Sequence, residues 1–293
     1  MTLVQFFGAI AKLSGLIFVV TSMVAMGLSL TVPQIIAPLR NVRLVILALF
    51  ANFVLIPLIA YGIIRVIPLA EPLQIGLILL ATAAGAPFLP KLVQVARGDI
   101  AFGVGLMVLL MVVTIIYMPI VLPLLLSGVQ VDPWAIAQSL ILLMLIPLGI
   151  ALFIRAQAPE TAATYQPVMN KASSLAILIL LVVGLGLNVS NILNLIGTGG
   201  ILALLLFIIA SFAIGFVLGL RDPGIRSVMG LGTAQRNISA ALVVGAQNFS
   251  DPNVITTLLV GAILLLLLLL PTARQLGSRV KASTPVAEPA AGS

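Results

Sequence analysis

The sequence predicts an all-α polytopic membrane protein with about nine transmembrane helices, and three observations support this fold class. The chain of 293 residues is 62% hydrophobic and only 7% charged, whereas soluble domains carry about 25% charged residues. Apolar runs of about 18 residues or more recur from end to end, and each can cross a bilayer as a helix. Most of the Lys and Arg residues fall in the short joints between those runs. The net charge of +7 therefore indicates membrane topology rather than nucleic-acid binding.

Nine predicted spans follow one another, with joints that carry proline, glycine or charge. They cover residues 8–31, 43–64, 73–96, 100–127, 134–155, 173–190, 199–220, 227–248 and 254–271. The first run lacks a basic start and a cleavage site, so we interpret it as a spanning helix rather than a signal peptide. The longest joint, Ala156 to Ala172, contains Pro159 and Pro167. We expect a transmembrane domain at 1–273 and a disordered cytoplasmic tail at 274–293.

Basic residues gather at alternate joints and so predict the orientation of the chain. With the N-terminus outside, the inner side collects Arg40, Arg43, Arg97, Arg155, Lys171, Arg221, Arg226, Arg274, Arg279 and Lys281. The outer side keeps Arg65, and Lys12 lies near the outer end of the first span. Because cytoplasmic loops carry the excess of Lys and Arg, we expect a cell (inner) membrane protein with its N-terminus outside and its C-terminus in the cytoplasm.

Two predicted spans are interrupted, and each carries a cation within the membrane. In the third span, Lys91 lies in "AAGAPFLPKLVQVARGD", where Pro87 and Pro90 each remove a backbone donor. In the eighth, Arg236 lies in "GLGTAQRNISAAL", which is rich in glycine and small polar residues. Broken backbone survives in lipid only where protein or a water-filled cavity satisfies it. Interrupted helices in corresponding places of two inverted halves indicate the binding site of a transporter, so we expect inverted repeats and a substrate site here.

Each of the two cations has a structural alternative to a functional role. A charge at the bilayer centre costs about 2.5–3.5 kcal/mol on insertion scales. Arg236 lies nine residues from Ser227, roughly 14 Å along a helix, which is far to reach the interface. It could bind substrate or cap the carbonyl groups of broken helices. Lys91 lies six residues from Arg97, about 9 Å along a helix, so it could bind substrate or extend to the interface.

Four polar residues complete the predicted substrate site. Thr233, Gln235 and Asn237 share the setting of Arg236, and Asn52 is a lone polar group in the middle of the second span, where it could also join helices. The chain has no Cys and no His, and its seven acidic residues all fall in joints or the tail. We therefore expect no enzymatic activity, no catalytic residue, no metal ligands and no cofactor.

The two interrupted segments and their neighbours resemble the bile acid:sodium symporter family. "VAMGLSL" is similar to that family's "FGMGLTL" helix, and "LALFANFVLIPLIA" to its glutamine-bearing helix. "ARGDIAFGVGL" is close to its "ARGNVALSV", and "QRNISAALVV" falls on its second crossing helix. The resemblance covers most of the chain, which begins at the family's second helix and so gives nine spans rather than ten. It implies two inverted repeats, with crossing interrupted helices in a core domain beside a panel domain.

The chain departs from the family at the positions that bind sodium. Gly232 stands where the family has the glutamate shared by both sodium sites, and Arg236 stands in place of the glutamine of the second crossing helix. The family's Ser-Asn pair falls on Leu89 and Pro90, and the glutamine of its third helix becomes Asn52. Sodium requires several oxygen ligands and usually a carboxylate. Sodium as a bound ion is therefore possible but doubtful.

The resemblance implies a secondary transporter of organic anions, in particular carboxylates. Our hypothesis is that Lys91 and Arg236 replace two bound sodium ions and present a positive potential to the anion, which makes transport independent of sodium. One alternative is a sodium symporter that uses backbone carbonyls near residues 232–237 together with Asn52. Another is a membrane sensor or scaffold without transport. The expected partners are a small organic anion and the lipid bilayer, while substrate identity, coupling ion, direction and oligomeric state stay open.

Overall fold

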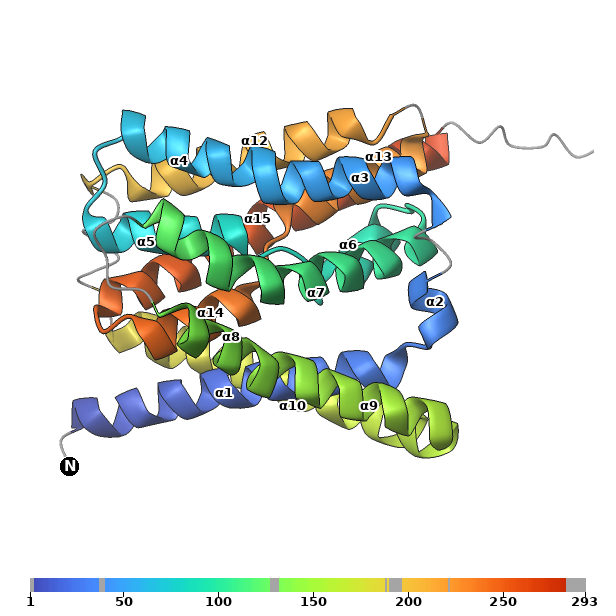
Figure 1. Cartoon of the computed structure of the whole chain (residues 1–293), viewed down its shortest axis with the longest axis horizontal. Coiled ribbons are helices and arrows are strands. Elements are labelled where there is room, and N and C mark those ends of the chain that lie inside the picture. The colour runs from blue at the N-terminus through green and yellow to red at the C-terminus, as the bar shows by residue number, and fades with distance from the viewer. Residues whose placement is uncertain are drawn as a thin grey trace, which may run out of the picture.

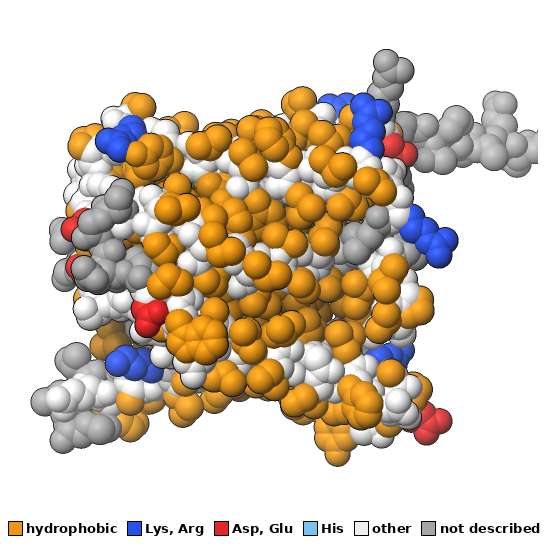
Figure 2. All heavy atoms as spheres, in the orientation of Figure 1, with side chains coloured by type: hydrophobic (Ala, Val, Ile, Leu, Met, Phe, Trp, Pro, Cys, Tyr) orange, Lys and Arg blue, Asp and Glu red, His pale blue; other side chains and the backbone are white. Residues whose placement is uncertain are grey.

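The described part of the chain is helical throughout. The computed structural model describes residues 3–36, 40–126, 132–187, 189, 197–220 and 222–282, and these contain helices but no strands. Seven helical segments are long and apolar enough to cross a membrane: Gln5–Ser29, Val42–Val66, Ile100–Leu125, Pro133–Gln157, Pro159–Gly184, Gly200–Leu218 and Pro252–Arg279. Figure 1 shows the long helices lying side by side, with their joints at two opposite ends. In Figure 2 hydrophobic side chains cover the middle of the visible face and charged ones lie towards its ends, as the sequence predicts for a membrane protein.

Both spans that the sequence predicts to be interrupted are broken in the structure. The third predicted span divides into α5 (Glu71–Thr82) and α6 (Leu89–Val95), and the eighth into α13 (Pro223–Ala234) and α14 (Ile238–Asn248). The prolines account for the first break, because each lacks a backbone N–H and crowds the preceding turn. The backbone N–H of Asn237, in the second break, donates to the carbonyl oxygen of Ala83 in the first at 2.9 Å. The two breaks therefore lie against each other.

A turn of π-helix interrupts the second span. This span consists of α3 (Val42–Phe50), η2 (Ala51–Leu55) and α4 (Ile56–Val66). Pro57 cannot donate to the carbonyl of Phe53 and its ring crowds that group, so the helix widens just before the proline. The freed carbonyl of Phe53 accepts a hydrogen bond from the Tyr117 hydroxyl at 2.7 Å. The wider turn also contains Asn52, which is fully buried, and π turns of this kind often occur at functional sites.

The helices form two groups, which we name after α1 and α5. The α1 group consists of α1 (Leu3–Ser29), α8 (Pro133–Leu140), η3 (Ile141–Leu145), α9 (Ile146–Gln157) and α10 (Pro159–Leu187). Within it α1 packs along α10 and α9, and Figure 1 shows these helices together on one side of the molecule. The α5 group contains the second span, both interrupted spans, α7 (Ile100–Leu125), α12 (Gly200–Leu218) and α15 (Pro252–Ala282). A short helix, α2 (Val32–Ile36), follows α1.

Two predicted boundaries differ from the structure. Most of the expected joint Ala156–Ala172 is helical, because α10 begins at Pro159 rather than near residue 173. A proline suits the first helical turn, where its missing N–H needs no partner, and Glu160 in the same turn favours the positive end of the helix dipole. The structure also extends α15 to Ala282, so the first part of the expected tail is helical, and residues 283–293 lie outside the described residues.

A close helix contact explains the extension of α15. A side chain at Gly277 would collide with the carbonyl oxygen of Val95 in α6, so the glycine lets α15 pack directly on the end of that helix. The segment that follows Pro271 is also rich in helix-forming residues and ends in basic ones, which stabilise a helix C-terminus. The sequence alone favoured a disordered tail from residue 274 because the segment that follows is rich in Ala, Pro and Ser.

Candidate functional site

Arg236 lies at the centre of the two breaks and is completely buried, with 0% of its surface exposed. Its Nε donates to the carbonyl oxygen of Leu80 at 2.9 Å, and its Nη2 to that of Ala81 at 2.7 Å. Its Nη1 donates at 2.9 Å to both the carbonyl oxygen of Thr233 and the Oδ1 of Asn52. The three carbonyls belong to the last turns of α5 and α13, where helix carbonyls lack intrahelical partners. The guanidinium therefore ties together the C-terminal ends of two half-helices.

Asn52 and Thr233 complete the buried contacts around this guanidinium. The Asn52 Nδ2 donates to the carbonyl oxygen of Ala48 at 3.0 Å and to the Thr233 Oγ1 at 3.3 Å. These bonds orient the amide so that its oxygen faces Arg236. Asn52 is 0% exposed and Thr233 is 1% exposed. Both residues therefore help to hold the second span against α13, and their side chains are occupied by contacts within the protein.

Asn237 holds the two breaks together from the other side. Its Nδ2 donates to the carbonyl oxygen of Gly85 at 3.0 Å, and its backbone N–H to that of Ala83 at 2.9 Å. Its Oδ1 accepts from the backbone N–H of Ala240 at 3.1 Å and so caps the start of α14. An N-cap of this kind contributes about 1 kcal/mol to helix stability. Asn237 therefore positions the start of α14 on the first break.

The space beside Gly232 is filled by hydrocarbon. A Cβ atom at this position would meet the Cδ2 of Leu89 at 3.1 Å and the Cδ2 of Leu106 at 3.2 Å. The family resemblance places a glutamate here, and its position is now bordered by two leucine side chains. In the part of the chain that the structure describes, no group of three or more His, Cys, Asp or Glu residues could hold a metal ion.

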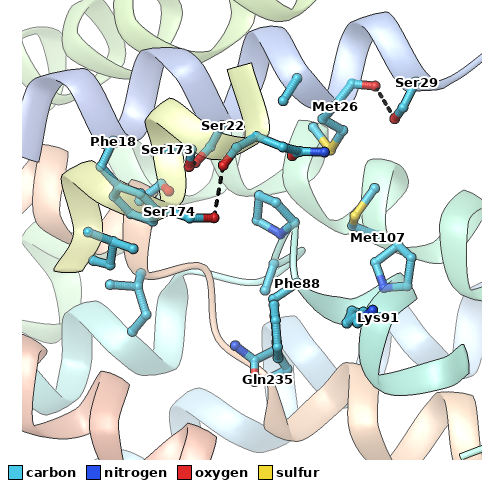
Figure 3. Close-up of a pocket in the computed structure, with 18 of the residues that line it drawn as sticks. Phe18, Ser22, Met26, Ser29, Phe88, Lys91, Met107, Ser173, Ser174 and Gln235 are labelled. Atoms are coloured by element: carbon cyan, nitrogen blue, oxygen red, sulfur yellow. Dashed lines mark hydrogen bonds between the residues drawn. The ribbon is translucent and has the colours of Figure 1, made fainter. Parts of the chain in front are cut away.

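A cavity of about 800 Å³ opens between the α1 group and the two breaks. Lys91 on α6 is exposed and faces this cavity, with Phe88 and Met107 beside it (Figure 3). The α1 group contributes the apolar side chains of Phe18 and Met26. It also contributes a polar set: Ser22, Ser29, Gln166, Asn170, Ser173 and Ser174. The described lining includes no acidic residue, so the cavity combines an apolar wall, neutral polar groups and a positive charge.

Two buried polar atoms beside the cavity lack hydrogen-bond partners. They are the Oε1 of Gln235 and the Oγ of Ser239, whose residues are 5% and 1% exposed. Both residues line the cavity. A buried polar group without a partner costs about 1–3 kcal/mol, so such an atom requires an explanation. Both residues flank the start of α14, where the helix dipole is positive and favours an anion.

The structure separates the predicted site residues into two sets. Arg236, Asn52, Thr233 and Asn237 form a buried network around the breaks. Lys91 and Gln235 line the cavity, and within the described residues the hydrogen bonds of the network do not include Lys91. Arg236 also borders the cavity, although none of its surface is exposed.

Sequence reasoning missed Ser239 and the polar side chains of the α1 group. A signal for the latter was present in the sequence. Ser22 and Ser29 recur seven residues apart in an otherwise apolar segment, and this spacing puts both on one face of a helix. Asn170, Ser173 and Ser174 likewise share a helix face by their spacing of three and four residues.

Comparison with known proteins decides the family. Residues 16–195, more than half of the chain, match the family described as "Sodium Bile acid symporter family". The chain belongs to this family. The match confirms the resemblance seen in the sequence, and membership agrees with a multi-pass membrane transporter rather than an enzyme.

Two curated relatives carry the same description, "Probable sodium/metabolite cotransporter BASS3, chloroplastic". The protein from Arabidopsis thaliana is 25% identical over 205 residues, which cover 70% of this chain and 47% of that protein. The protein from Oryza sativa subsp. japonica is 24% identical over 195 residues, which cover 66% of this chain and 46% of that protein. The chain thus spans about half the length of the curated relatives it matches.

Proposed function

We propose that this family member is a secondary transporter of small organic anions, most of all carboxylates, and that its transport does not depend on sodium. The observation that carries the proposal is the cavity: Lys91 faces it, and the described lining contains no acidic residue. A site with a fixed cation and no carboxylate favours an anion. The relatives named as sodium/metabolite cotransporters support a small molecule as the substrate.

In this proposal Lys91 binds the anionic group of the substrate. The Ser239 hydroxyl donates to this group, which gives its unpartnered Oγ a role, and the start of α14 adds a positive dipole. The unpartnered Oε1 of Gln235 can only accept, so it pairs with a hydroxyl or other donor elsewhere on the substrate. Phe18, Met26 and neighbouring apolar side chains bind the rest of the molecule. The polar groups thus fix the orientation of the substrate, and the apolar wall sets the size that fits.

We assign Arg236 the role of a built-in cation rather than that of a direct substrate ligand. Its guanidinium donates to oxygen atoms of Leu80, Ala81, Thr233 and Asn52, and carbonyl and amide oxygens of this kind are ligands that a sodium ion would use. These oxygens already have a donor that cannot dissociate. Arg236 therefore acts on the substrate indirectly, by stabilising the network of residues around the two breaks.

A sodium-coupled mechanism remains the second candidate, and a specific observation favours it. The Oε1 of Gln235 and the Oγ of Ser239 are buried oxygens without partners, and they could ligate sodium together with backbone carbonyls. Against this, the nearest atoms to a side chain at position 232 belong to Leu89 and Leu106. An ion bound there would lack a nearby carboxylate.

We expect the purified protein to bind carboxylates about equally in sodium and choline salts. Isothermal titration with pyruvate, benzoate and cholate, and with their neutral amides, tests this. At least one carboxylate should bind ten times more tightly than its amide, about 1.4 kcal/mol, because only the charged form pairs with Lys91. Lys91→Gln should remove this preference. Lys12→Gln, which removes an exposed lysine of α1 outside the cavity, is the matched control.

The same titrations separate the three candidate functions. A tenfold gain in affinity on adding sodium supports symport and contradicts the sodium-independent proposal. Binding of no carboxylate in either salt, together with no uptake into proteoliposomes, supports a sensor or scaffold. Equal binding of a carboxylate and its amide removes Lys91 as the anion ligand.

We further propose that the chain crosses the cell membrane nine times, as two inverted halves, with the α1 group as the panel and the α5 group as the core. The seven apolar spans and the two broken ones, α5–α6 and α13–α14, support this count. The N-terminus then lies outside and the C-terminus in the cytoplasm. Because the chain has no cysteine, Arg65→Cys should react in intact cells with a membrane-impermeant thiol reagent, and Arg274→Cys only after permeabilisation. The reverse pattern contradicts the orientation, and equal reactivity contradicts the odd number of crossings.

A further inference from the structure

We infer that the protein exchanges an anion on one side of the membrane for an anion on the other much faster than it carries an anion in one direction. The reason is that its empty site holds a positive charge that only the bound anion balances. This inference rests on the proposed function, and it concerns the mode of transport at that same cavity. Two fixed cations, Arg236 and Lys91, differ in how they are compensated.

The charge of Arg236 is compensated within the protein, whether or not a ligand is bound. The guanidinium is 0% exposed and donates to three carbonyls at the ends of α5 and α13. Each helix C-terminus carries roughly half a negative elementary charge, so two of them together offset about one positive charge. Arg236 thus gives a neutral unit that does not change during transport.

The charge of Lys91 has no comparable partner. Its side chain is exposed to the cavity, whose described lining contains serine, asparagine, glutamine and apolar residues but no carboxylate. The acidic residues that the structure describes lie at the starts of helices or in joints, as Asp99, Asp132 and Asp222 illustrate. The dipole at the start of α14 adds to the positive potential. The empty cavity is therefore positive, and a bound monovalent anion brings it close to neutral.

This difference sets the relative rates of the two reorientation steps. A transporter that moves its site between the two faces of the membrane must do so loaded in one direction and, for net transport, empty in the other. An uncompensated charge in the membrane interior is costly. The loaded site avoids that cost through its bound anion, and with no coupling ion nothing else neutralises the empty site. Exchange omits the empty step, so it is the faster mode.

Proteoliposomes separate exchange from net uptake. Vesicles filled with the same unlabelled anion report exchange, and vesicles without anion report net uptake. Uptake of labelled pyruvate, benzoate and cholate is measured at saturating concentration, with the membrane potential held at zero by potassium and valinomycin. We expect the initial rate of exchange to exceed net uptake at least tenfold for each anion that is transported. Lys91→Gln should lower this ratio to below about three, because its empty site is neutral. Lys91→Arg and Lys12→Gln should keep the ratio of the unmodified protein.

The outcomes distinguish failure of this inference from failure of the proposed function. Equal rates of exchange and net uptake in the unmodified protein overturn the inference and leave anion transport intact. An unchanged ratio in Lys91→Gln also overturns it, because the charge of Lys91 is then not the cause. Absence of carboxylate binding and of both fluxes overturns the proposed function itself, and binding without flux in either mode overturns transport and exchange together.

Discussion

Replacing Arg236 with glutamine should strongly destabilise the protein and make its stability depend on sodium. Removal of the guanidinium leaves the carbonyls of Leu80, Ala81 and Thr233 and the Oδ1 of Asn52 without their donor. Each buried acceptor left without its donor costs about 1–3 kcal/mol, so the loss of these bonds destabilises the fold by several kcal/mol. In a chain of 293 residues each kcal/mol lowers the melting temperature by roughly 2 °C, so we expect a fall of about 5–10 °C. A sodium ion can then occupy the released oxygens and restore part of the loss.

The measurement is a thermal melt in detergent with sodium or choline chloride. The unmodified protein should melt at the same temperature in both salts, while Arg236→Gln should melt several degrees higher in sodium. The melting temperature of Arg236→Lys should lie between those of the unmodified protein and Arg236→Gln, because lysine keeps the charge but loses the planar fork of donors. Arg279→Gln, which changes an exposed arginine near the end of α15, should melt as the unmodified protein does. Stabilisation of the unmodified protein by sodium contradicts the role of Arg236 as a substitute cation.

Substituting alanine for Gly85 should prevent correct folding or lower the melting temperature even further. Gly85 has a φ of 78°, a left-handed conformation that residues with a Cβ adopt only with strain. A Cβ there would collide with the backbone N of Met111 and lie 2.6 Å from the carbonyl oxygen of Met107. Since both are backbone atoms of α7, the break or the helix must move. The carbonyl of Gly85 also binds Asn237, so this movement separates the two breaks.

This expectation is tested by comparing the expression level and melting temperature of Gly85→Ala with those of Gly62→Ala. A Cβ at Gly62 would meet nothing within 4 Å, so Gly62→Ala controls for the change of residue type and should fold normally. If Gly85→Ala folds and melts within a few degrees of the unmodified protein, α7 can yield at low cost. The close packing of the first break on α7 is then not essential to the fold.

The sequence alone determined the membrane fold class and the positions of both helix breaks. Apolar runs and basic joints are local properties of the chain, and they fix which segments can cross a bilayer. Gly85, Pro87 and Pro90 fall close together in the sequence, and such a cluster favours an interruption because the missing N–H and the crowding ring are built into proline. Arg236 was identifiable as a candidate for the same reason, since a charge so far from an interface is costly in any arrangement.

Tertiary structure decided what those residues contact. Arg236 donates to Leu80, a residue 156 positions away in the sequence, and no local pattern specifies such a contact. The sequence led us to expect that Arg236 and Lys91 both bind the substrate. The structure places Arg236 among the carbonyls of two helix ends and Lys91 at an open cavity. The extension of α15 to Ala282 also depended on a distant contact, that of Gly277 with α6. Composition and spacing determine where a helix must break, but the partners of the broken ends depend on how distant segments pack.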